Sequence, residues 1–434
     1  MIQQQDLNVT TLGECRYRSP LVFESPSHAR AAHMVTDSCR IRFSVELRPE
    51  PDGTEALSFE EAGPRERIFF DPAKTTAAVV TCGGLSPGLN NVIRSLFYEL
   101  EENYGVQSVL GIRNGYLGLT PEADREPMIL TRDYVEPIDK LGGTKLGSSR
   151  GPQDPSVMVD FLQARKIDML FCLGGDGTQR GAHAIHEEVA RRGLSIAIVG
   201  IPKTIDNDIP FVRQAFGYVT ALEKAAEVIR GAHIEARDAV HGVALVKLMG
   251  RHAGFIAAGA SVVSQEVNFT LVPELPFPLD GENGFLAALE RRIRKRRHAV
   301  IVVAEGAGQH LFDRAEEACD TSGNRLSHDI ASLLKTRIKA HFAQCGLAFS
   351  LKYLDPSYFI RSVPANAFDR FLCDQMGRHA VHAAMAGKTG MLIGYEHNQF
   401  IHVPIPAVAS QEKQLDVTGD LWRAVLQVTR QPRW

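Results

Sequence analysis

The feature that most constrains the fold is a unit that recurs from about residue 75 onward: an apolar strand, a polar or glycine-rich turn, and an amphipathic helix. The predicted strands are 76–82, 167–173, 195–201, 242–249 and 299–304. The predicted helices are 89–100, 178–192, 217–233, 326–344 and 366–386. Repeats of this kind favour a mostly parallel sheet with right-handed crossovers. We therefore predict an α/β fold with ligands at the carboxyl ends of the strands.

The composition fits a globular α/β chain with a large core. Of the 434 residues, 44% are hydrophobic and 23% are charged, which excludes disorder of the whole chain. Lys and Arg number 48 and Asp and Glu 51, so the net charge is −3 and offers no overall attraction to nucleic acid or to an anionic membrane. No apolar run is long enough to span a bilayer, and the N-terminus has no secretory pattern. We therefore expect a cytoplasmic protein.

The cysteines and histidines follow no recognised metal or disulfide pattern. The 7 cysteines are widely spaced without a CxxC, and the 15 histidines show no HExxH. This usage predicts reduced cysteines and argues against a zinc site. The densest basic run, 291–297, has no interleaved aromatic residues and is interpreted as a solvated helix face.

Residues 1–75 differ in texture from the rest. They contain proline-rich and acidic stretches, and apolar residues alternate with polar ones over 41–47. The alternation predicts one half-exposed strand. We interpret this region as an N-terminal extension packed on a core domain, with a flexible tail as the alternative.

Two of the predicted turns are rich in glycine. The segment 82–90 lets backbone N–H groups approach a phosphate at a helix N-terminus, although many tight turns look the same. In 173–178 (LGGDGT) the glycines leave little room for side chains except the carboxylate of Asp176. A nucleotide phosphate could therefore lie on the backbone while Asp176 reaches a Mg²⁺ ion. The alternative is a sharp strand-to-helix turn with an aspartate cap.

Two further strand ends carry charged groups. In 202–208 (PKTIDND) an extended chain would point Asp206 and Asp208 the same way, so that one could accept a proton from a hydroxyl. An Asx-rich turn is the alternative. In 247–251 (KLMGR) Arg251 follows a strand end and could bind phosphate, or lie at the surface. The small-residue loop 142–150 could cover phosphates or be a flexible loop.

Taken together, these segments resemble the phosphofructokinase family. The motifs GGLSPGLN, GYLGL, GGTKLGSSR, GGDGT, PKTIDND, MGR and AEG, and the stretch from Arg361 to Gly377, follow that family's order across about 75–400. The resemblance implies a two-domain phosphofructokinase-like fold with the active site in the cleft between the domains. It also implies a glycolytic kinase that converts fructose 6-phosphate to fructose 1,6-bisphosphate with ATP and Mg²⁺, and that forms a homodimer or homotetramer.

The resemblance also assigns roles to individual positions. It implies that Asp206 is the general base and that Asp176 is the Mg²⁺ ligand. Implied catalytic partners are Lys203, Thr204, Asp208 and Arg251. Implied nucleotide and phosphate contacts are Gly84, Tyr116, Arg150, Gly175, Gly177 and Thr178. Implied contacts to the sugar phosphate are Thr204, Asp206, Met249, Gly250, Arg251, Glu305, Lys352, Tyr358 and Arg361.

The resemblance further predicts the domain limits. After the extension 1–75, a phosphate-donor domain would comprise 76–217 and 362–410, and a sugar-phosphate domain 218–361 and 411–434. Because the short bacterial enzymes have no counterpart of the extension, the family's usual allosteric effectors are not carried over to this chain.

Four positions bear on the identity of the phosphate donor and on whether neighbouring subunits share the sugar site. Lys203 matches the pyrophosphate-dependent relatives, whereas Gly177 leaves space for the α-phosphate of ATP, where those relatives usually have Asp. We favour ATP, as in the similar ATP-dependent enzymes of trypanosomes and plants. Gly242 replaces an arginine that many bacterial members extend into a neighbouring subunit, and Lys352 aligns with a second such residue. The alternatives are a pyrophosphate-dependent enzyme and a catalytically silent subunit that binds sugar phosphate.

Overall fold

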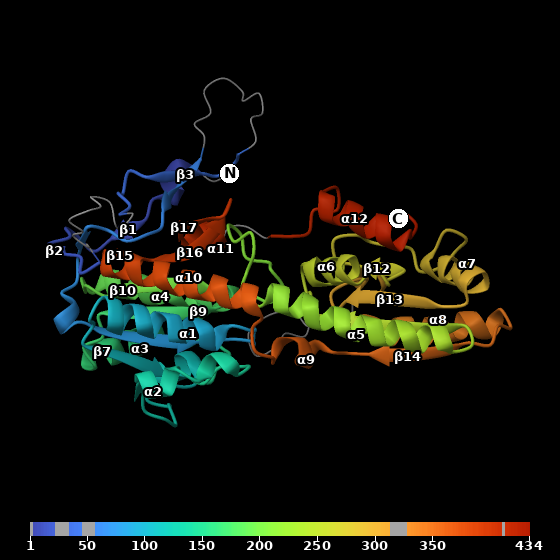
Figure 1. The fold of residues 1–434 in the computed structure, drawn as a ribbon, viewed down its shortest axis with the longest axis horizontal. Helices are drawn as coiled ribbons and strands as arrows, with labels where there is room; N and C mark the ends of the chain where they lie inside the picture. The colour runs from blue at the N-terminus through green and yellow to red at the C-terminus, as the bar shows by residue number, and fades with distance from the viewer. Residues whose placement is uncertain (1–2, 22–33, 46–56, 313–327, 410–412) are drawn as a thin grey trace, which may run out of the picture. The chain divides into compact units, whose positions relative to one another are not determined.

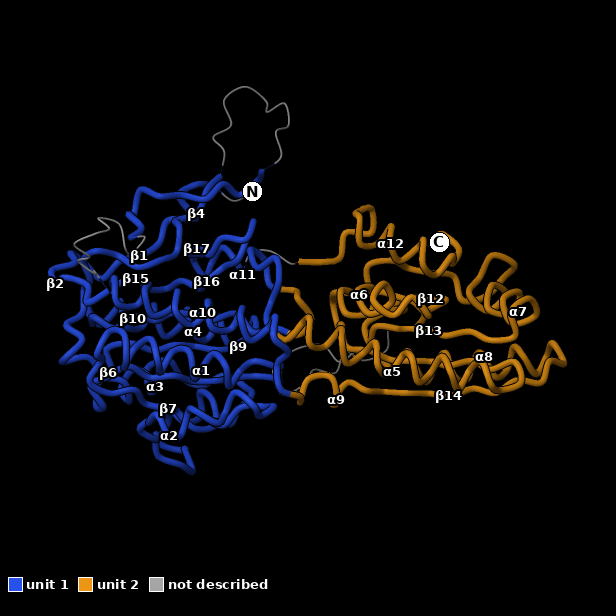
Figure 2. Tube along the Cα trace, in the orientation of Figure 1, with its two compact units in different colours: residues 1–204, 209–216, 364–412 blue, residues 205–208, 217–363, 413–434 orange. Residues whose placement is uncertain are grey.

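The computed structural model describes residues 3–21, 34–45, 57–312, 328–409 and 413–434. Figure 2 shows that the chain divides into two compact units. Unit 1 comprises residues 1–204, 209–216 and 364–412, and unit 2 comprises 205–208, 217–363 and 413–434. The N-terminal 75 residues therefore belong with unit 1.

Unit 1 is built on a nine-stranded mixed sheet with the order β3-β4-β17-β16-β10-β9-β6-β7-β8 (Figure 1). Its strands are β3 (Arg40–Arg42), β4 (Ser58–Glu61), β6 (Thr76–Thr81), β7 (Ser108–Ile112), β8 (Met128–Ile129), β9 (Met169–Gly174), β10 (Ala197–Pro202), β16 (Met391–Glu396) and β17 (Gln399–Pro404). The central run from β16 to β7 is parallel, and both margins are antiparallel. Two small pairs join β1 (Thr10–Thr11) to β15 (Lys388–Thr389) and β2 (Tyr17–Arg18) to β5 (Arg67–Ile68).

Helices cover both faces of this sheet. The helices of unit 1 are α1 (Leu89–Tyr98), α2 (Arg132–Val135), α3 (Pro155–Ala164), α4 (Asp176–Arg191), α10 (Ala367–Met385) and α11 (Ile405–Ala409), with the short turns η1 (Gln4–Leu7), η2 (Pro72–Lys74), η3 (Glu99–Asn103), η4 (Gly115–Leu119) and η5 (Ile138–Lys140). Alternate residues of each central strand enter different cores: Val79 lies in the core with α1 and α10, and Val80 lies in the core with α3 and α4. The apolar runs are thus buried on both sides, as a parallel sheet requires.

The N-terminal region is fastened to unit 1 through a buried charged cluster on β4. The carboxylate of Glu60 accepts hydrogen bonds from Arg65 at 2.8 Å and from His402 at 3.0 Å, and lies 2.9 Å from the ammonium of Lys388. All four side chains are less than 10% exposed. Because β4 also pairs with β17, this part of the extension is an integral strand of the sheet.

Unit 2 holds a four-stranded parallel sheet with the order β12-β13-β11-β14. Its strands are β11 (Gly242–Leu248), β12 (Phe269–Leu271), β13 (Ala299–Ala304) and β14 (Ser350–Leu354). Its helices are α5 (Tyr218–Asp238), α6 (Phe255–Ser264), α7 (Phe285–Arg296), α8 (Ile330–Gln344), α9 (Ser357–Arg361) and α12 (Asp420–Thr429), with the turn η6 (Gln309–Leu311). One core, separate from those of unit 1, fills the space between these helices and the sheet.

The predicted α/β fold is confirmed, and the predicted strands and helices are present with shifts of a few residues at their ends. The N-terminal strand is shorter than expected: β3 ends at Arg42, and Leu47 lies outside the described residues. Six cysteines in the described ranges are free, while Cys319 falls outside them. No helix in the described part combines the length and apolarity needed to cross a membrane.

Candidate active site

In unit 1, loops that are far apart in the sequence converge on Gly83. The loop after β6 is held to the end of β9 by the Cys82 N–H, which donates to the Leu173 carbonyl at 2.9 Å. The Gly83 N–H donates to the Ser149 carbonyl at 3.1 Å, and the Ser148 hydroxyl donates to the Gly83 carbonyl at 2.7 Å. The segment 142–150 is therefore bound to the first glycine loop.

A lysine and a threonine face the same glycine. A Cβ atom on Gly83 would lie 3.6 Å from Nζ of Lys203 and 3.9 Å from Oγ1 of Thr178. The Lys203 N–H donates to the Gly174 carbonyl at 3.0 Å, which fixes the lysine beside the turn that starts α4. The structure thus brings an ammonium, a hydroxyl and a helix N-terminus together, an arrangement that attracts phosphate.

The glycines of the GGDGT turn have different amounts of space around them. A Cβ at Gly174 would lie 2.1 Å from Oγ1 of Thr178, and one at Gly175 would lie 3.3 Å from the Lys203 carbonyl. A Cβ at Gly177 would meet only Arg180, at 3.8 Å. Glycine is required at 174 and a Cβ would be tight at 175, whereas the folded chain has room for a side chain at 177.

Tyr116 and Gln179 support this turn from inside. The Tyr116 hydroxyl donates to the Thr178 carbonyl at 2.7 Å, and the side chain is 6% exposed. Burial raises the pKa of Tyr116 well above its ordinary value, so it remains a neutral donor. The buried Gln179 amide donates to the Gly174 carbonyl at 3.0 Å. Tyr116, predicted as a donor contact, therefore holds the first turn of α4.

Asp176 lies at the N-terminus of α4 with its carboxylate about half exposed and paired with Arg180. Mg²⁺ usually takes one or two carboxylates, substrate phosphates and several waters. An accessible carboxylate beside a phosphate-attracting turn fits that donor set. Arg150, at the end of the 142–150 loop, is exposed, and Gly84 is half-buried in the first glycine loop.

In unit 2, the segments that end β11 and β13 are locked together. The Glu305 N–H donates to the Leu248 carbonyl at 2.9 Å, and the Gly306 N–H donates to the Gly250 carbonyl at 3.0 Å. A Cβ at Gly306 would lie 1.8 Å from the Arg251 carbonyl. The close approach of the two backbones brings Met249, Gly250, Arg251 and Glu305 to one edge of the sheet.

The end of β14 reaches the same edge. The ammonium of Lys247 lies 2.8 Å from Asp355, just after β14, and the Arg361 guanidinium lies 4.7 Å from the ring centre of the exposed Tyr358 in α9. Lys352 is placed differently, because it pairs with Ala244 near the start of β11. Met249 comes five positions after Ala244, which in an extended strand is a distance of about 16 Å.

The boundary between unit 1 and unit 2 falls inside the PKTIDND motif (202–208). Lys203 and Thr204 belong to unit 1, whereas 205–208, with Asp206 and Asp208, belong to unit 2. Asn207 has a φ of 58°, so the backbone is left-handed between the two aspartates and not continuously extended. Lys203 is 6% exposed, and both aspartates are partly accessible.

The chain is similar in sequence to known proteins over most of its length. The sequence model described as phosphofructokinase matches residues 76–384. The ATP-dependent 6-phosphofructokinase of Borreliella burgdorferi is 47% identical over 98% of this chain and 97% of its own length. The ATP-dependent 6-phosphofructokinase of Trypanosoma brucei brucei is 43% identical over 99% of this chain and 88% of its own.

The chain belongs to the phosphofructokinase family. A solved structure agrees in fold: the pyrophosphate-dependent phosphofructokinase of Marinobacter aquaeolei has a TM-score of 0.67 at 22% identity, covering 83% of this chain and 92% of its own. The resemblance inferred from the motifs is thereby confirmed.

The structure explains why this chain has Gly242 where many bacterial members of the phosphofructokinase family have an arginine. Position 242 begins β11, and a Cβ there would lie 2.0 Å from the Ala236 carbonyl in α5. This backbone accepts only glycine, so no arginine can extend from here toward another subunit.

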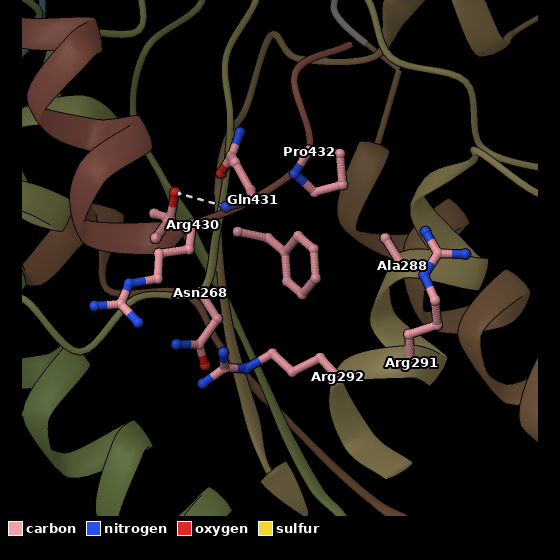
Figure 3. Close-up of a pocket in the computed structure, with 9 residues that line it drawn as sticks. Asn268, Ala288, Arg291, Arg292, Arg430, Gln431 and Pro432 are labelled. Carbon is pink, nitrogen blue, oxygen red and sulfur yellow. Dashed lines mark hydrogen bonds between the residues drawn. The ribbon is translucent and has the colours of Figure 1, made fainter. Parts of the chain in front are cut away.

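Unit 2 of this phosphofructokinase also contains a basic pocket of about 190 Å³, shown in Figure 3. Arg291 and Arg292 of α7 and Arg430 after α12 line it, beside Asn268 before β12. It lies at the amino ends of the strands and contains none of the residues predicted for the active site. Arg292 is half-buried, an exception to the solvated face predicted for 291–297.

Proposed function

We propose that the protein transfers the γ-phosphoryl group of ATP to the 1-hydroxyl of fructose 6-phosphate, giving fructose 1,6-bisphosphate and ADP. The observation that carries this proposal is the 47% identity, over nearly the whole of both chains, to a relative named as an ATP-dependent 6-phosphofructokinase. The space at Gly177 supports ATP as the donor, because a side chain is absent where the fold has room for one.

On the donor side, unit 1 supplies the groups that bind phosphate. The ammonium of Lys203, the hydroxyl of Thr178 and the N-terminus of α4 attract the phosphates of ATP. Arg150, Gly84 and Gly175 contribute further contacts, and Tyr116 positions the turn. Asp176 would hold Mg²⁺, which neutralises charge on the donor phosphates when bound. For this binding Arg180 must release or share the Asp176 carboxylate.

On the acceptor side, Asp206 accepts the proton of the sugar's 1-hydroxyl as its oxygen attacks the phosphoryl group. A positioned base contributes roughly 10²–10⁴ in rate. Thr204 and Asp208 orient this segment. Arg251, with Met249, Gly250 and Glu305 at the same sheet edge, binds the sugar phosphate together with Tyr358 and Arg361. Lys352 remains a proposed contact to the sugar phosphate, of this or of a neighbouring subunit in a homo-oligomer.

A pyrophosphate-dependent enzyme is the second candidate. Lys203 favours it, because a lysine at this position matches the pyrophosphate-dependent relatives, whereas Gly177 opposes it. A silent sugar-phosphate-binding subunit is the third, and it is disfavoured because Asp176, Asp206 and Arg251 are all retained.

The deciding experiment measures fructose 1,6-bisphosphate formation by the purified protein from fructose 6-phosphate and Mg²⁺, with ATP and pyrophosphate supplied in parallel. Turnover with ATP alone supports the proposal. Turnover with pyrophosphate alone identifies Lys203 as the better marker of the donor and overturns it. Binding of fructose 6-phosphate without turnover by either donor would identify the silent subunit.

A further inference from the structure

Three potential metal ligands of different chemistry meet between two helices of unit 2. Glu290 lies on α7, while His341 and Cys345 lie on α8 and at its C-terminal cap. The spacing of four residues places His341 and Cys345 on one helix face, opposite Glu290. The donor atoms Oε2, Nε2 and Sγ of these residues all lie within 4.8 Å of one another.

The distances between these donor atoms match one face of a zinc tetrahedron. Nε2 of His341 lies 2.9 Å from Oε2 of Glu290, Sγ of Cys345 lies 3.3 Å from the same oxygen, and Sγ lies 3.6 Å from Nε2. Zn²⁺ bonds of about 2.0–2.3 Å at tetrahedral angles require donor separations of about 3.3–3.6 Å. Changes of less than about 0.5 Å in the distances between these donor atoms would therefore give the separations of a tetrahedral zinc site.

We propose that Glu290, His341 and Cys345 form a binding site for a divalent transition-metal ion of the zinc class, with water as the fourth ligand. A carboxylate, a thiolate and a neutral imidazole together carry two negative charges and neutralise the ion. Glu290 and His341 are each 22% exposed, so the ion and the water can enter from solvent. This inference does not rest on the proposed kinase activity.

The neighbouring groups are compatible with such a site. Arg294 donates from Nε to Oε1 of Glu290 at 2.7 Å and leaves Oε2 for the metal. Outer partners of this kind orient a ligating carboxylate. A mixed sulfur, nitrogen and oxygen set selects zinc-class ions over Mg²⁺, which prefers oxygen ligands in an octahedral arrangement. The Mg²⁺ required for phosphoryl transfer would therefore not occupy it.

Formation of the metal–sulfur bond breaks the S–H bond of Cys345, and its proton passes to the buffer.

The site escaped the sequence analysis because its third ligand comes from another helix, 51 residues away from His341. The remaining signal is the H-x-x-x-C pair at 341–345, which the search for CxxC and HExxH does not detect. The sequence analysis argued against a zinc site because these motifs detect only ligands that lie close together in the sequence.

The test uses the full-length protein, stripped of metal with a chelator and titrated with Co²⁺ in the presence of Mg²⁺. Co²⁺ reports a thiolate ligand through its sulfur-to-metal absorption band. We expect the band to saturate at one equivalent and to be displaced by Zn²⁺. The Cys345→Ser variant should lose the band, and the His341→Gln variant should need at least ~10-fold more metal for half-saturation.

The matched control is Cys39→Ser, a half-buried free cysteine in unit 1, which should keep the band unchanged. A band that survives Cys345→Ser, or the absence of any one-equivalent band in the unsubstituted protein, would overturn the proposal. If Cys345→Ser fails to fold by circular dichroism, the His341→Gln titration still decides the question.

Discussion

At the scale of single residues, we propose that the choice of phosphate donor depends on Lys203 and Gly177, both of which were singled out from the sequence. Lys203 is buried with its ammonium beside Gly83, and Gly177 faces open space at the start of α4. The sequence alone could not show that a Cβ fits at 177 but not at 174, because this depends on where Thr178 and Arg180 lie. The glycine at 177 is thus not required by the fold, which leaves ligand binding as its explanation.

We expect the Gly177→Asp variant to fold normally and to lose activity with ATP by on the order of 10-fold or more. A carboxylate a few ångströms from a nucleotide phosphate repels it by more than about 1.4 kcal/mol in a partly polar site. The measurement is kcat/KM for ATP and for pyrophosphate, with Gly177→Asn as the isosteric uncharged control. Equal losses in both variants would point to crowding rather than charge.

For Asp206→Asn we expect an unchanged fold and a kcat lowered by roughly 10²–10⁴, because the amide cannot accept the proton of the sugar hydroxyl. The KM for fructose 6-phosphate should change little. Steady-state kinetics would check this, with Asp238→Asn, at the exposed end of α5, as the control. Full activity in Asp206→Asn would contradict the assignment of the base.

At the scale of secondary-structure elements, the periodicity of the sequence located the parallel strands β6, β9, β10, β11 and β13. It did not locate the parallel strands β7, β12, β14 and β16 or the antiparallel margin of the larger sheet. The hairpin of β16 and β17 turns at His397 and Asn398, both with positive φ, where no Gly gives the usual sequence signal. Its partner β4 comes from more than 300 residues earlier. Such pairing depends on tertiary contacts, chiefly the cluster around Glu60, that local patterns do not encode.

The Glu60 cluster yields a stability prediction for β4. Burial by itself would raise the pKa of Glu60, but the hydrogen bond and charge of His402 and the charge of Lys388 lower it to about 2. Glu60→Gln removes the buried carboxylate beside Lys388 and Arg65 and leaves both paired with the more exposed Asp37. We therefore expect the free energy of unfolding to fall by about 3 kcal/mol at pH 7. Denaturant unfolding would measure this, with exposed Glu66→Gln as the control.

The lowered pKa of Glu60 also sets the pH range over which its carboxylate stabilises the folded state. Because the folded pKa lies below the unfolded value, the contribution of Glu60 is complete above about pH 4.5 and is lost as the pH falls toward 2. The difference between the unsubstituted protein and Glu60→Gln should therefore be constant from pH 7 to 5 and narrow below 4.5. A difference that narrows between pH 7 and 5 would show that another group carries the stability.

At the scale of the whole molecule, the two units have separate hydrophobic cores and carry separate halves of the proposed chemistry. The phosphate-binding loops belong to unit 1. The residues proposed for the sugar phosphate belong to unit 2, except Thr204, which lies in unit 1. Both tryptophans, Trp422 and Trp434, lie in the core of unit 2 or pack against it. Tryptophan fluorescence therefore reports unit 2, whereas circular dichroism reports both units.

Because the two signals report different parts of the molecule, they can show which unit binds which substrate. Because a ligand stabilises the unit that binds it, by ~2.7 kcal/mol at 100 times its Kd, each substrate should move one thermal transition. We expect fructose 6-phosphate alone to raise the fluorescence-detected transition, with fructose as the control. Mg²⁺ with ATP should raise a transition seen by circular dichroism and leave the fluorescence transition in place. Transitions that coincide under every condition would mean that the units unfold together, and a fluorescence shift with ATP alone would place nucleotide binding on unit 2.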